Sequence, residues 1–332
     1  MKIFRVIALL CLSLGCVPVR AELQDGSMEV HWNPGAEDCK AAAPAPLQVH
    51  RYNDRTFIIR ENLCVTEEGP FMYLLVGSAR ALLIDTGDVA DPAVAPVART
   101  VLGLLPTVGA SHLPLLVVHT HGHLDHRRGD AQFQGLPGVQ VVATDLQHVT
   151  AFFGFKDWPR GTAVVDLGDR QVDVLPTPGH SAAEVSYYDR SAGLLFTGDF
   201  LLPGRLLIAD KAADLASALR VADFIRFHPV AYVLGGHIEL DADGDGYGLG
   251  AHYHPNEHVL QMTRADVLEL PALVNQFNGF YTRVGPILML NQNRVLAASA
   301  IGLLIALVGA VWGSRRYIRY RRHRWEVKRP YG

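Results

Sequence analysis

The stretch VVHTHGHLDHRRGD, residues 117–130, concentrates side chains that can bind a metal ion. Neutral imidazole and carboxylate groups hold Zn²⁺ while leaving coordination positions open for water. Two histidines one residue apart can project from one extended end toward the same ion. The stretch therefore predicts a metal centre rather than a polar loop that happens to be rich in histidine. Its candidate residues are His119, His121, His123, Asp125 and His126.

Further polar residues stand where apolar runs end. Active sites on sheet scaffolds form where strand ends converge, because the rigid ladder fixes positions while the loops supply ligands. We therefore expect these residues to lie close together. They are Asp85 after ALLI, His121 after LLVV, His180 after VDVLPTPG, Asp199 after LLFTG and His237 after YVLGG.

The elements that must position these residues are short strands mixed with helices. Strands are expected at 56–60, 71–77, 80–87, 113–118, 139–143, 170–175, 184–189, 193–199 and 231–236. Helices are expected at 93–105, 145–153, 211–227 and 256–276. Because strands and helices do not alternate strictly, the pattern indicates an α/β (α+β) fold with two mixed sheets and helices packed outside.

Charge is distributed unevenly along the 332 residues, whose net charge is −3. Residues 1–21 carry +3 and residues 314–332 carry +7, which leaves −13 for residues 22–313. Nucleic-acid binding depends on neutralising phosphates with basic side chains. An acidic body therefore argues against nucleic acid and for a small-molecule substrate, while the oligomeric state stays open.

The N-terminal residues 1–21 have the pattern of a secretory signal peptide. A basic start precedes an apolar centre, and Val19-Arg20-Ala21 is a small-residue cleavage site. Lipidation of Cys16 is the alternative interpretation.

Residues 295–313 are uncharged and about as long as a bilayer-spanning helix requires. A buried core helix is the alternative. Because the basic tail at 314–332 follows at once, the positive-inside rule puts that tail in the cytoplasm. The body is then expected outside the cytoplasm, in a periplasm or an extracellular space.

Two cysteines, Cys39 and Cys64, remain in the body once the signal peptide is removed. An oxidising compartment would allow a disulfide between them, and free thiols are the alternative. A disulfide would tie the Pro- and Ala-rich arm at 22–46, which is expected to be irregular, to the first strands. Residues 47–290 are expected to form the catalytic domain.

The ligand pattern resembles that of the metallo-β-lactamase superfamily, from about residue 50 to about residue 240. The resemblance implies an αββα sandwich and a centre for two metal ions. In T-H-x-H-x-D-H, TPGHS, FTGDF and GGHIE, the implied ligands are His121, His123 and His180 for the first metal, Asp125, His126 and His237 for the second, and Asp199 as the bridge. Asp85, in LLIDTG, resembles the buried acid that supports the histidine loop. His119 falls outside the register, so a supporting or structural role is expected.

The implied cofactor is two Zn²⁺ ions, with iron or manganese as alternatives. A water shared by two such ions drops in pKa from about 16 toward about 7. The resulting metal-bridging hydroxide could attack an acyl carbon while the ions stabilise the developing charge. Asp125 could orient this nucleophile or transfer its proton, which makes it the candidate catalytic residue.

The bridging Asp199 bears on the substrate. True β-lactamases of this fold do not usually carry that aspartate, whereas glyoxalase II-like thioesterases and lactonases do. The sequence therefore predicts an exported, membrane-anchored dinuclear zinc hydrolase that cleaves a thioester, lactone or amide. The alternatives are an iron-dependent oxidoreductase of the same fold, similar to persulfide dioxygenases, and a β-lactamase. The complete ligand set argues against a non-catalytic binding module.

Two features after His237 have simpler interpretations. The DADGDG stretch at 241–246 is similar to the start of a calcium loop, but its twelfth position is a histidine rather than the expected glutamate. A surface turn is therefore expected. The histidines at 252, 254 and 258 are expected in a turn and a helix start, with substrate contact as the alternative.

Overall fold

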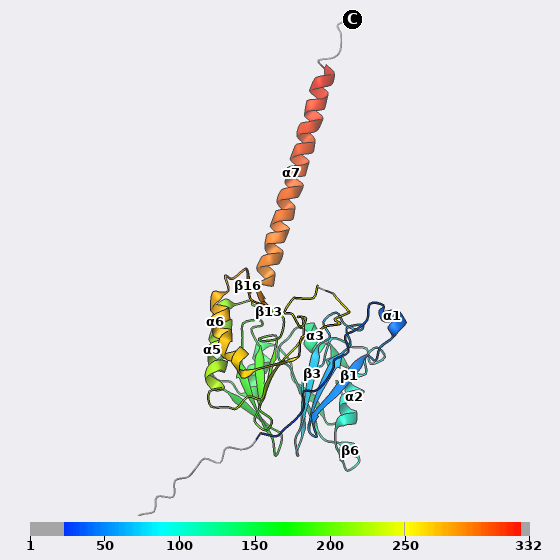
Figure 1. Cartoon of the computed structure of the whole chain (residues 1–332), viewed down its shortest axis with the longest axis vertical. Helices are drawn as coiled ribbons and strands as arrows, with labels where there is room; N and C mark the ends of the chain where they lie inside the picture. The colour runs from blue at the N-terminus through cyan, green and yellow to red at the C-terminus, as the bar shows by residue number, and fades with distance from the viewer. Residues whose placement is uncertain (1–22, 249, 327–332) are drawn as a thin grey trace, which may run out of the picture.

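The body of the molecule is a sandwich of two six-stranded sheets with helices on both outer faces (Figure 1). The computed structural model describes residues 23–248 and 250–326. The expected signal peptide at 1–21 lies outside the described residues, as do residues 327–332. Two facing mixed sheets with helices outside confirm the expected αββα fold class.

The first sheet has the strand order β1-β2-β3-β4-β7-β8. Its strands are β1 (Leu47–Asn53), β2 (Thr56–Glu61), β3 (Phe71–Val76), β4 (Ala81–Ile84), β7 (Leu115–Val118) and β8 (Val139–Val141). The β7 strand pairs in parallel with β4 and with β8. The pairs β1–β2, β2–β3 and β3–β4 are antiparallel. Every residue of β3, β4 and β7 is buried, which explains their unbroken apolar runs.

The second sheet has the order β15-β14-β12-β11-β10-β9. Its strands are β9 (Ala163–Asp166), β10 (Gln171–Pro176), β11 (Val185–Asp189), β12 (Leu194–Gly198), β14 (Tyr232–Gly235) and β15 (Gln261–Met262). The helices α5 (Lys211–Phe224) and α6 (Arg264–Gln276) cover its outer face, and α2 (Val97–Leu104) covers that of the first sheet (Figure 1). The main core lies between the sheets, where Tyr73 packs on Phe196.

The remaining elements of the body are short. A third sheet of order β13-β17-β16 lies beside the second one. These elements are α1 (Cys39–Ala42), β5 (Thr107–Val108), β6 (Ser111–His112), α3 (Leu124–Arg127), η1 (Arg128–Gln132), α4 (Leu146–Phe153), β13 (Arg205–Leu207), β16 (Tyr281–Val284) and β17 (Ile287–Leu290).

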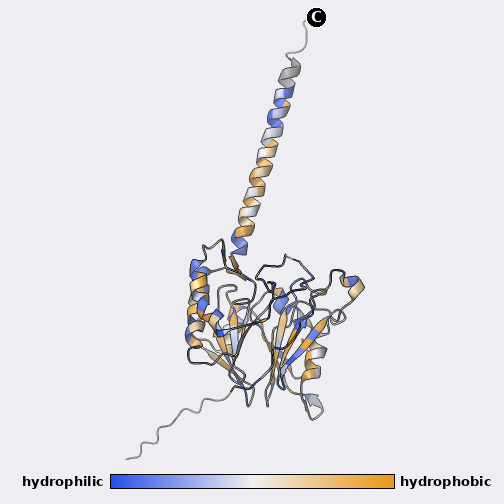
Figure 2. Ribbon diagram, viewed as in Figure 1, coloured by the Kyte–Doolittle hydropathy of each residue, from blue (hydrophilic) through white to orange (hydrophobic). Residues whose placement is uncertain are grey.

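The last helix, α7 (Gln292–Glu326), projects away from the body (Figure 1). Among the described residues, one helix is long and apolar enough to cross a membrane, and it is the part of α7 from Gln292 to Arg321. None of its most apolar stretch is buried against the body, so α7 is not a core helix (Figure 2). The helix continues beyond residue 313, and the expected tail at 314–332 therefore begins as its last turns.

Several expected boundaries are wrong. The helix expected at 256–276 begins only at Arg264, where Thr263 and Asp266 form a capping box. The strand expected at 80–87 ends at Ile84, because Asp85 adopts a left-handed φ of 64°. The described part of the expected arm, residues 23–46, is irregular apart from α1 and an isolated β-bridge between Gly35 and Tyr253.

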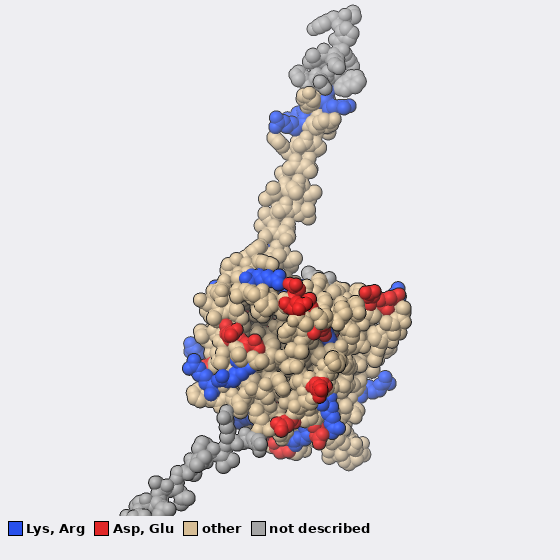
Figure 3. All heavy atoms as spheres, in the orientation of Figure 1, with Lys and Arg blue, Asp and Glu red and all other residues tan. Residues whose placement is uncertain are grey.

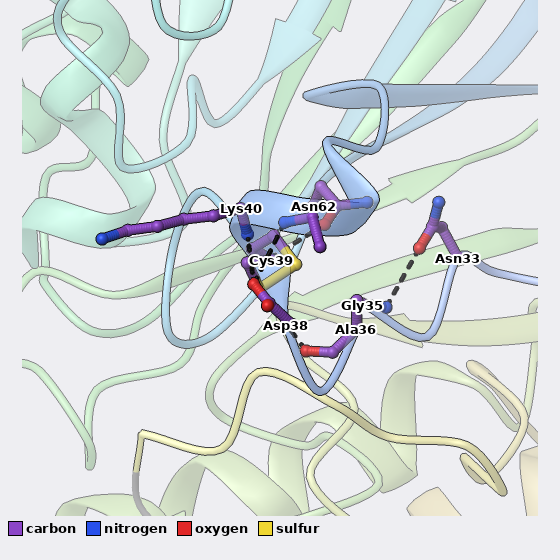
Figure 4. Close-up of a disulfide and its surroundings, with 9 residues drawn as sticks. Asn33, Gly35, Ala36, Asp38, Cys39, Lys40 and Asn62 are labelled. Atoms are coloured by element: carbon purple, nitrogen blue, oxygen red, sulfur yellow. Dashed lines mark hydrogen bonds between the residues drawn. A yellow bond between two sulfur atoms is a disulfide. The ribbon is translucent and has the colours of Figure 1, made fainter.

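The arm is linked to the body by a disulfide between Cys39 and Cys64 (Figure 4). Asp38 caps the short α1 helix by accepting hydrogen bonds from the backbone N–H groups of Lys40 and Ala41. The disulfide joins two cysteines that are 25 positions apart in the sequence. A crosslink that closes a loop of this size adds about 3 kcal/mol to the free energy of unfolding in the chain-entropy model.

Candidate metal centre

The expected metal ligands meet at one edge of the sandwich, and they come from both sheets. The segment after β7 carries His121 and His123, and the short helix α3 that follows carries Asp125 and His126. The segments after β10, β12 and β14 of the second sheet carry the other three ligands. The side chains form two groups that could each hold an ion: His121, His123 and His180, and Asp125, His126, Asp199 and His237.

The first trio consists of His121, His123 and His180. The Nε2 atom of His180 lies 3.2 Å from Nε2 of His121 and 2.9 Å from Nδ1 of His123. Its Nδ1 atom donates to the carbonyl oxygen of Leu207 at 2.7 Å. A proton on Nδ1 leaves the Nε2 lone pair directed at the other two rings, as a metal ligand requires.

The second trio consists of Asp125, His126 and His237. The Oδ2 atom of Asp125 lies 3.0 Å from Nε2 of His126 and 3.1 Å from Nε2 of His237. The two Nε2 atoms are 3.1 Å apart. The Nδ1 atoms of both rings have other partners. Nδ1 of His126 lies 2.9 Å from the Asp85 carboxylate, and Nδ1 of His237 lies 3.3 Å from the Glu68 carbonyl oxygen. Three donor atoms thus converge on one point.

Asp199 lies between the two trios. Its Oδ1 atom is 3.3 Å from Nε2 of His126 and its Oδ2 atom is 3.6 Å from Nε2 of His180. Oδ1 is buried and has no hydrogen-bond partner among the described residues. A buried carboxylate oxygen without a partner is costly unless a cation satisfies it. The donor set therefore fits two cations with a shared carboxylate.

Two glycines leave the space that this arrangement needs. Gly198 has a φ of 52°, and a Cβ there would lie 2.6 Å from the Thr120 side chain. A Cβ on Gly236 would lie 2.6 Å from Oδ1 of Asp199 and 2.7 Å from the ring of His126. Gly198 therefore lies too close to Thr120, and Gly236 too close to two candidate ligands, for any other residue to fit.

Asp85 supports the histidine segment from behind. Its buried carboxylate accepts hydrogen bonds from the backbone N–H of Thr120 at 2.8 Å and from the Thr120 hydroxyl at 2.9 Å. The same carboxylate lies 2.9 Å from Nδ1 of His126. Because a carboxylate can only accept, His126 carries its proton on Nδ1 and presents Nε2 to the second trio.

His119 belongs to neither trio. Its Nε2 atom lies 2.8 Å from Oδ1 of Asp130, which also accepts a hydrogen bond from the hydroxyl of Thr86. Its carbonyl oxygen accepts a hydrogen bond from the hydroxyl of Tyr187 at 2.8 Å. His119 thus links the segment that carries the candidate ligands to Asp130 and Tyr187.

The charges of the site are strongly coupled. Burial opposes a charge on His237, yet the negative charge of Asp199 and the hydrogen bond to Asp125 outweigh burial and raise the pKa of His237 to about 10. Burial also opposes the charge on Asp199, but the positive charges of His126 and His237 hold the pKa of that carboxyl well below its usual range. The carboxylates therefore demand positive charge at this place, which metal ions can supply in place of protons.

Glu68 is a part of the site for which the sequence carries no signal, because it lies in a polar turn, TEEGP. Its carbonyl oxygen accepts the Nδ1 proton of His237, and its half-exposed carboxylate lies 3.8 Å from Nε2 of the same ring. Glu68 also lines a cavity of about 60 Å³ beside the second trio, together with Glu67, Arg205, Glu239, Tyr247 and His254.

The three later histidines have different surroundings. His254 is buried, stacks on Tyr247 at 3.8 Å and places Nδ1 2.9 Å from Glu257. His252 is exposed, and His258 is partly buried with its Nδ1 on the carbonyl of the next residue. The DADGDG stretch is a turn in which Asp241 accepts the backbone N–H groups of residues 243 and 245.

Comparison with known proteins agrees with this geometry. Residues 65–237, just over half of the chain, match the family model of the metallo-beta-lactamase superfamily. The chain belongs to the metallo-beta-lactamase superfamily. This assignment confirms the family that the ligand pattern resembles, and it places the chain among metal-dependent hydrolases.

Two curated members of the metallo-beta-lactamase superfamily illustrate the similarity. The chain is 25% identical to the acyl-coenzyme A thioesterase MBLAC2 of Gallus gallus over 229 residues, which cover 59% of this chain and 82% of the relative. It is 29% identical to a hydroxyacylglutathione hydrolase of Maricaulis maris over 170 residues, which cover 50% of this chain and 61% of the relative. A solved metallo-beta-lactamase from Pontibacter korlensis is 19% identical with a TM-score of 0.49, and the match covers 70% of this chain and 100% of that one.

Proposed function

We propose that the protein is an exported, membrane-anchored hydrolase that holds two Zn²⁺ ions and cleaves a small acyl substrate, foremost a thioester. The observation that supports it most is the position of Asp199, whose two carboxylate oxygens face different trios. A carboxylate in this position can be shared by two cations and reduce their mutual repulsion. The seven ligands named above are the proposed ligand set.

Different residues of the chain have different roles in the proposed hydrolysis. Two bound ions would lower the pKa of water and polarise the acyl carbonyl. Asp125, whose side chain is 21% exposed, can orient the attacking water and accept its proton. Asp85 and the Leu207 carbonyl fix the rings of His126 and His180, so the lone pairs stay aimed at the site.

A thioester is preferred to a β-lactam for two reasons. The relatives are named for acyl-coenzyme A and hydroxyacylglutathione hydrolysis. The negative charge of Asp199 also makes the two proposed metal ions less electrophilic. This favours a substrate whose leaving group departs easily as a thiolate. A nitrogen anion needs more stabilisation from the second ion than a thiolate does.

Metal analysis combined with a substrate panel tests this function. We expect the full chain in detergent to carry two zinc ions and to hydrolyse an activated thioester or lactone with a higher kcat/KM than a cephalosporin. A chelator or His121→Ala should abolish the activity. Stoichiometric iron with oxygen consumption would indicate the oxidoreductase instead. Comparable kcat/KM on the cephalosporin, abolished by His121→Ala, would indicate a β-lactamase.

Three features support the proposed location. The helix α7 is exposed and long enough to span a bilayer. Basic residues follow its apolar part, and such residues are retained on the cytoplasmic side. The disulfide between Cys39 and Cys64 suits an oxidising compartment. The proposed topology has the body outside and the C-terminal end in the cytoplasm, with residues 1–21 removed as a signal peptide.

Reporter fusions test the topology. A reporter that is active only in the cytoplasm should work when fused after Gly332, and one that is active only outside should not. In intact cells the body should be shielded from protease by the outer envelope and become accessible when that envelope is opened. Activity of the external reporter at Gly332 would reverse the orientation.

A further inference from the structure

The first trio is connected to the foot of α7 by a single strand pairing. His180 donates from Nδ1 to the carbonyl oxygen of Leu207 in β13. Leu207 pairs with Leu290 at the end of β17, and the chain enters α7 at Gln292. Adjacent strands lie about 5 Å apart. The metal centre is therefore close to the point where the chain leaves the body, and α3 and β13 lie at that same end (Figure 1).

The foot of α7 is fixed to the body without a flexible linker. Asn291 is buried, and its side-chain amide donates to the carbonyl oxygen of Ala209 at 2.9 Å. Its carboxamide oxygen accepts the backbone N–H of Arg294 at 3.1 Å, and its own N–H donates to Phe280. The Arg294 guanidinium donates to the carbonyl oxygen of Gly279 at 2.9 Å. The body therefore cannot turn its metal centre freely away from the direction of the helix.

The apolar part of α7 begins at Val295, four residues after Asn291. Four residues of α-helix rise about 6 Å. The headgroup layer on each side of a bilayer is about 5–8 Å thick. With the apolar run in the hydrocarbon core, the headgroups reach the surface of the body beside the metal centre.

The side chains at this end suit a membrane interface. Phe280 is 43% exposed and Tyr281 is 50% exposed, in and next to β16 at the foot of α7. Aromatic residues are enriched at the headgroup level of membranes. Leu124, between the ligands His123 and Asp125, is also 50% exposed. Apolar contact with a bound molecule is thus available at the metal centre itself.

The cavity beside the second trio is acidic. Glu67, Glu68 and Glu239 line it, and Arg205, which also lines it, pairs with Glu239 at 2.8 Å. Figure 3 shows acidic and basic atoms side by side at this end of the body. The carboxylates of Glu67 and Glu68, the latter 3.8 Å from Nε2 of His237, repel a polyanionic leaving group such as coenzyme A. A leaving group with an uncharged or zwitterionic headgroup does not meet this electrostatic repulsion.

From this placement, we infer that the substrate is a membrane-resident amphiphile: a long-chain acyl thioester or ester with an uncharged or zwitterionic headgroup, cleaved at headgroup depth. The inference rests on the proposed hydrolase activity and membrane anchoring. In the reaction, water adds its oxygen to the acyl carbon, the carbon–sulfur or carbon–oxygen bond breaks, and a proton passes to the leaving thiolate or alkoxide. The products are a fatty acid and a thiol or alcohol.

The test compares two substrates on one enzyme. The full chain is reconstituted into phosphatidylcholine vesicles and given S-palmitoyl thioglycerol, which partitions into the bilayer, or S-butyryl thioglycerol, which stays in water. A flexible Gly-Ser linker of about ten residues, which spans about 17 Å, is inserted between Arg294 and Val295. The matched control carries the same linker between Gly313 and Ser314, beyond the apolar run. The measured quantity is the ratio of the palmitoyl to the butyryl kcat/KM.

The linker after Arg294 should lower this ratio by about tenfold, because the site no longer stays at headgroup depth, and the control should leave it unchanged. Any general loss of activity cancels in the ratio. An unchanged ratio, or faster cleavage of palmitoyl-coenzyme A than of S-palmitoyl thioglycerol by the unmodified chain, would overturn the inference. Failure of the unmodified, metal-loaded chain to cleave either thioester would instead refute the proposed hydrolase activity.

Discussion

Asp199→Asn is expected to lower kcat/KM for a thioester by more than about 100-fold, since even residues that only support metal ligands contribute 10- to 100-fold. The substitution keeps the shape of the side chain and removes its charge. Each trio then loses its share of the one carboxylate that faces both, at 3.3 Å from His126 and 3.6 Å from His180. The affinity for both ions should fall together.

The comparison with His237→Ala makes this result specific. His237 contacts the second trio, and its Nε2 atom is 3.1 Å from Asp125. Its removal should mainly empty the second position and leave about one ion per chain. Asp54→Asn, at an exposed position in the turn after β1, should retain the full metal content. Two tightly bound ions and normal turnover in Asp199→Asn would show that the carboxylate does not bridge.

Asp85→Asn is expected to reduce metal affinity and turnover by about 10- to 100-fold, with the greater effect at the second position. An amide can hold its N–H₂ group toward Nδ1 of His126, which would shift the ring proton to Nε2 and block the lone pair. Zinc titration of the metal-free protein, followed by calorimetry, would measure the affinity of each position.

A matched control exists in the same region. Asp130 also accepts hydrogen bonds from a threonine hydroxyl and a histidine ring, those of Thr86 and His119, but that histidine belongs to neither trio. Asp130→Asn should therefore leave the metal affinity nearly unchanged. An equal loss in both variants would mean that Asp85 acts through general packing, or that His119 supports the ligands after all.

The two-sheet architecture could be predicted from the sequence because its central strands are buried on both faces. The runs at 71–77 and 113–118 are continuous and apolar, and this pattern predicts strands without any tertiary information. The β1 strand was not expected, because its burial is irregular and His50 and Arg51 interrupt its apolar pattern. The β13 strand has only three residues and owes its structure to its pairing with β17.

The residues of the site also differ in whether the sequence alone could predict their role. The candidate ligands could be named because their chemistry is visible in residue type and spacing, and the structure brings them into two groups that could each hold an ion. Glu68 and Leu207 could not, since each reaches a ligand ring from a distant segment, and Leu207 acts through a backbone carbonyl that every residue possesses. The foot at Asn291 likewise depends on one partner, Ala209, that is 82 positions away in the sequence.

The proposed ligands are divided between the two sheets: four follow β7 of the first sheet, and three follow strands of the second. Neither half of the sandwich alone offers a complete set of donors, so high-affinity ion capture has to come late in folding, after the sheets have docked. An exported chain that crosses the membrane unfolded would then acquire its ions only on the far side. The metal supply of that outer compartment, rather than that of the cytoplasm, would decide which ion the enzyme carries.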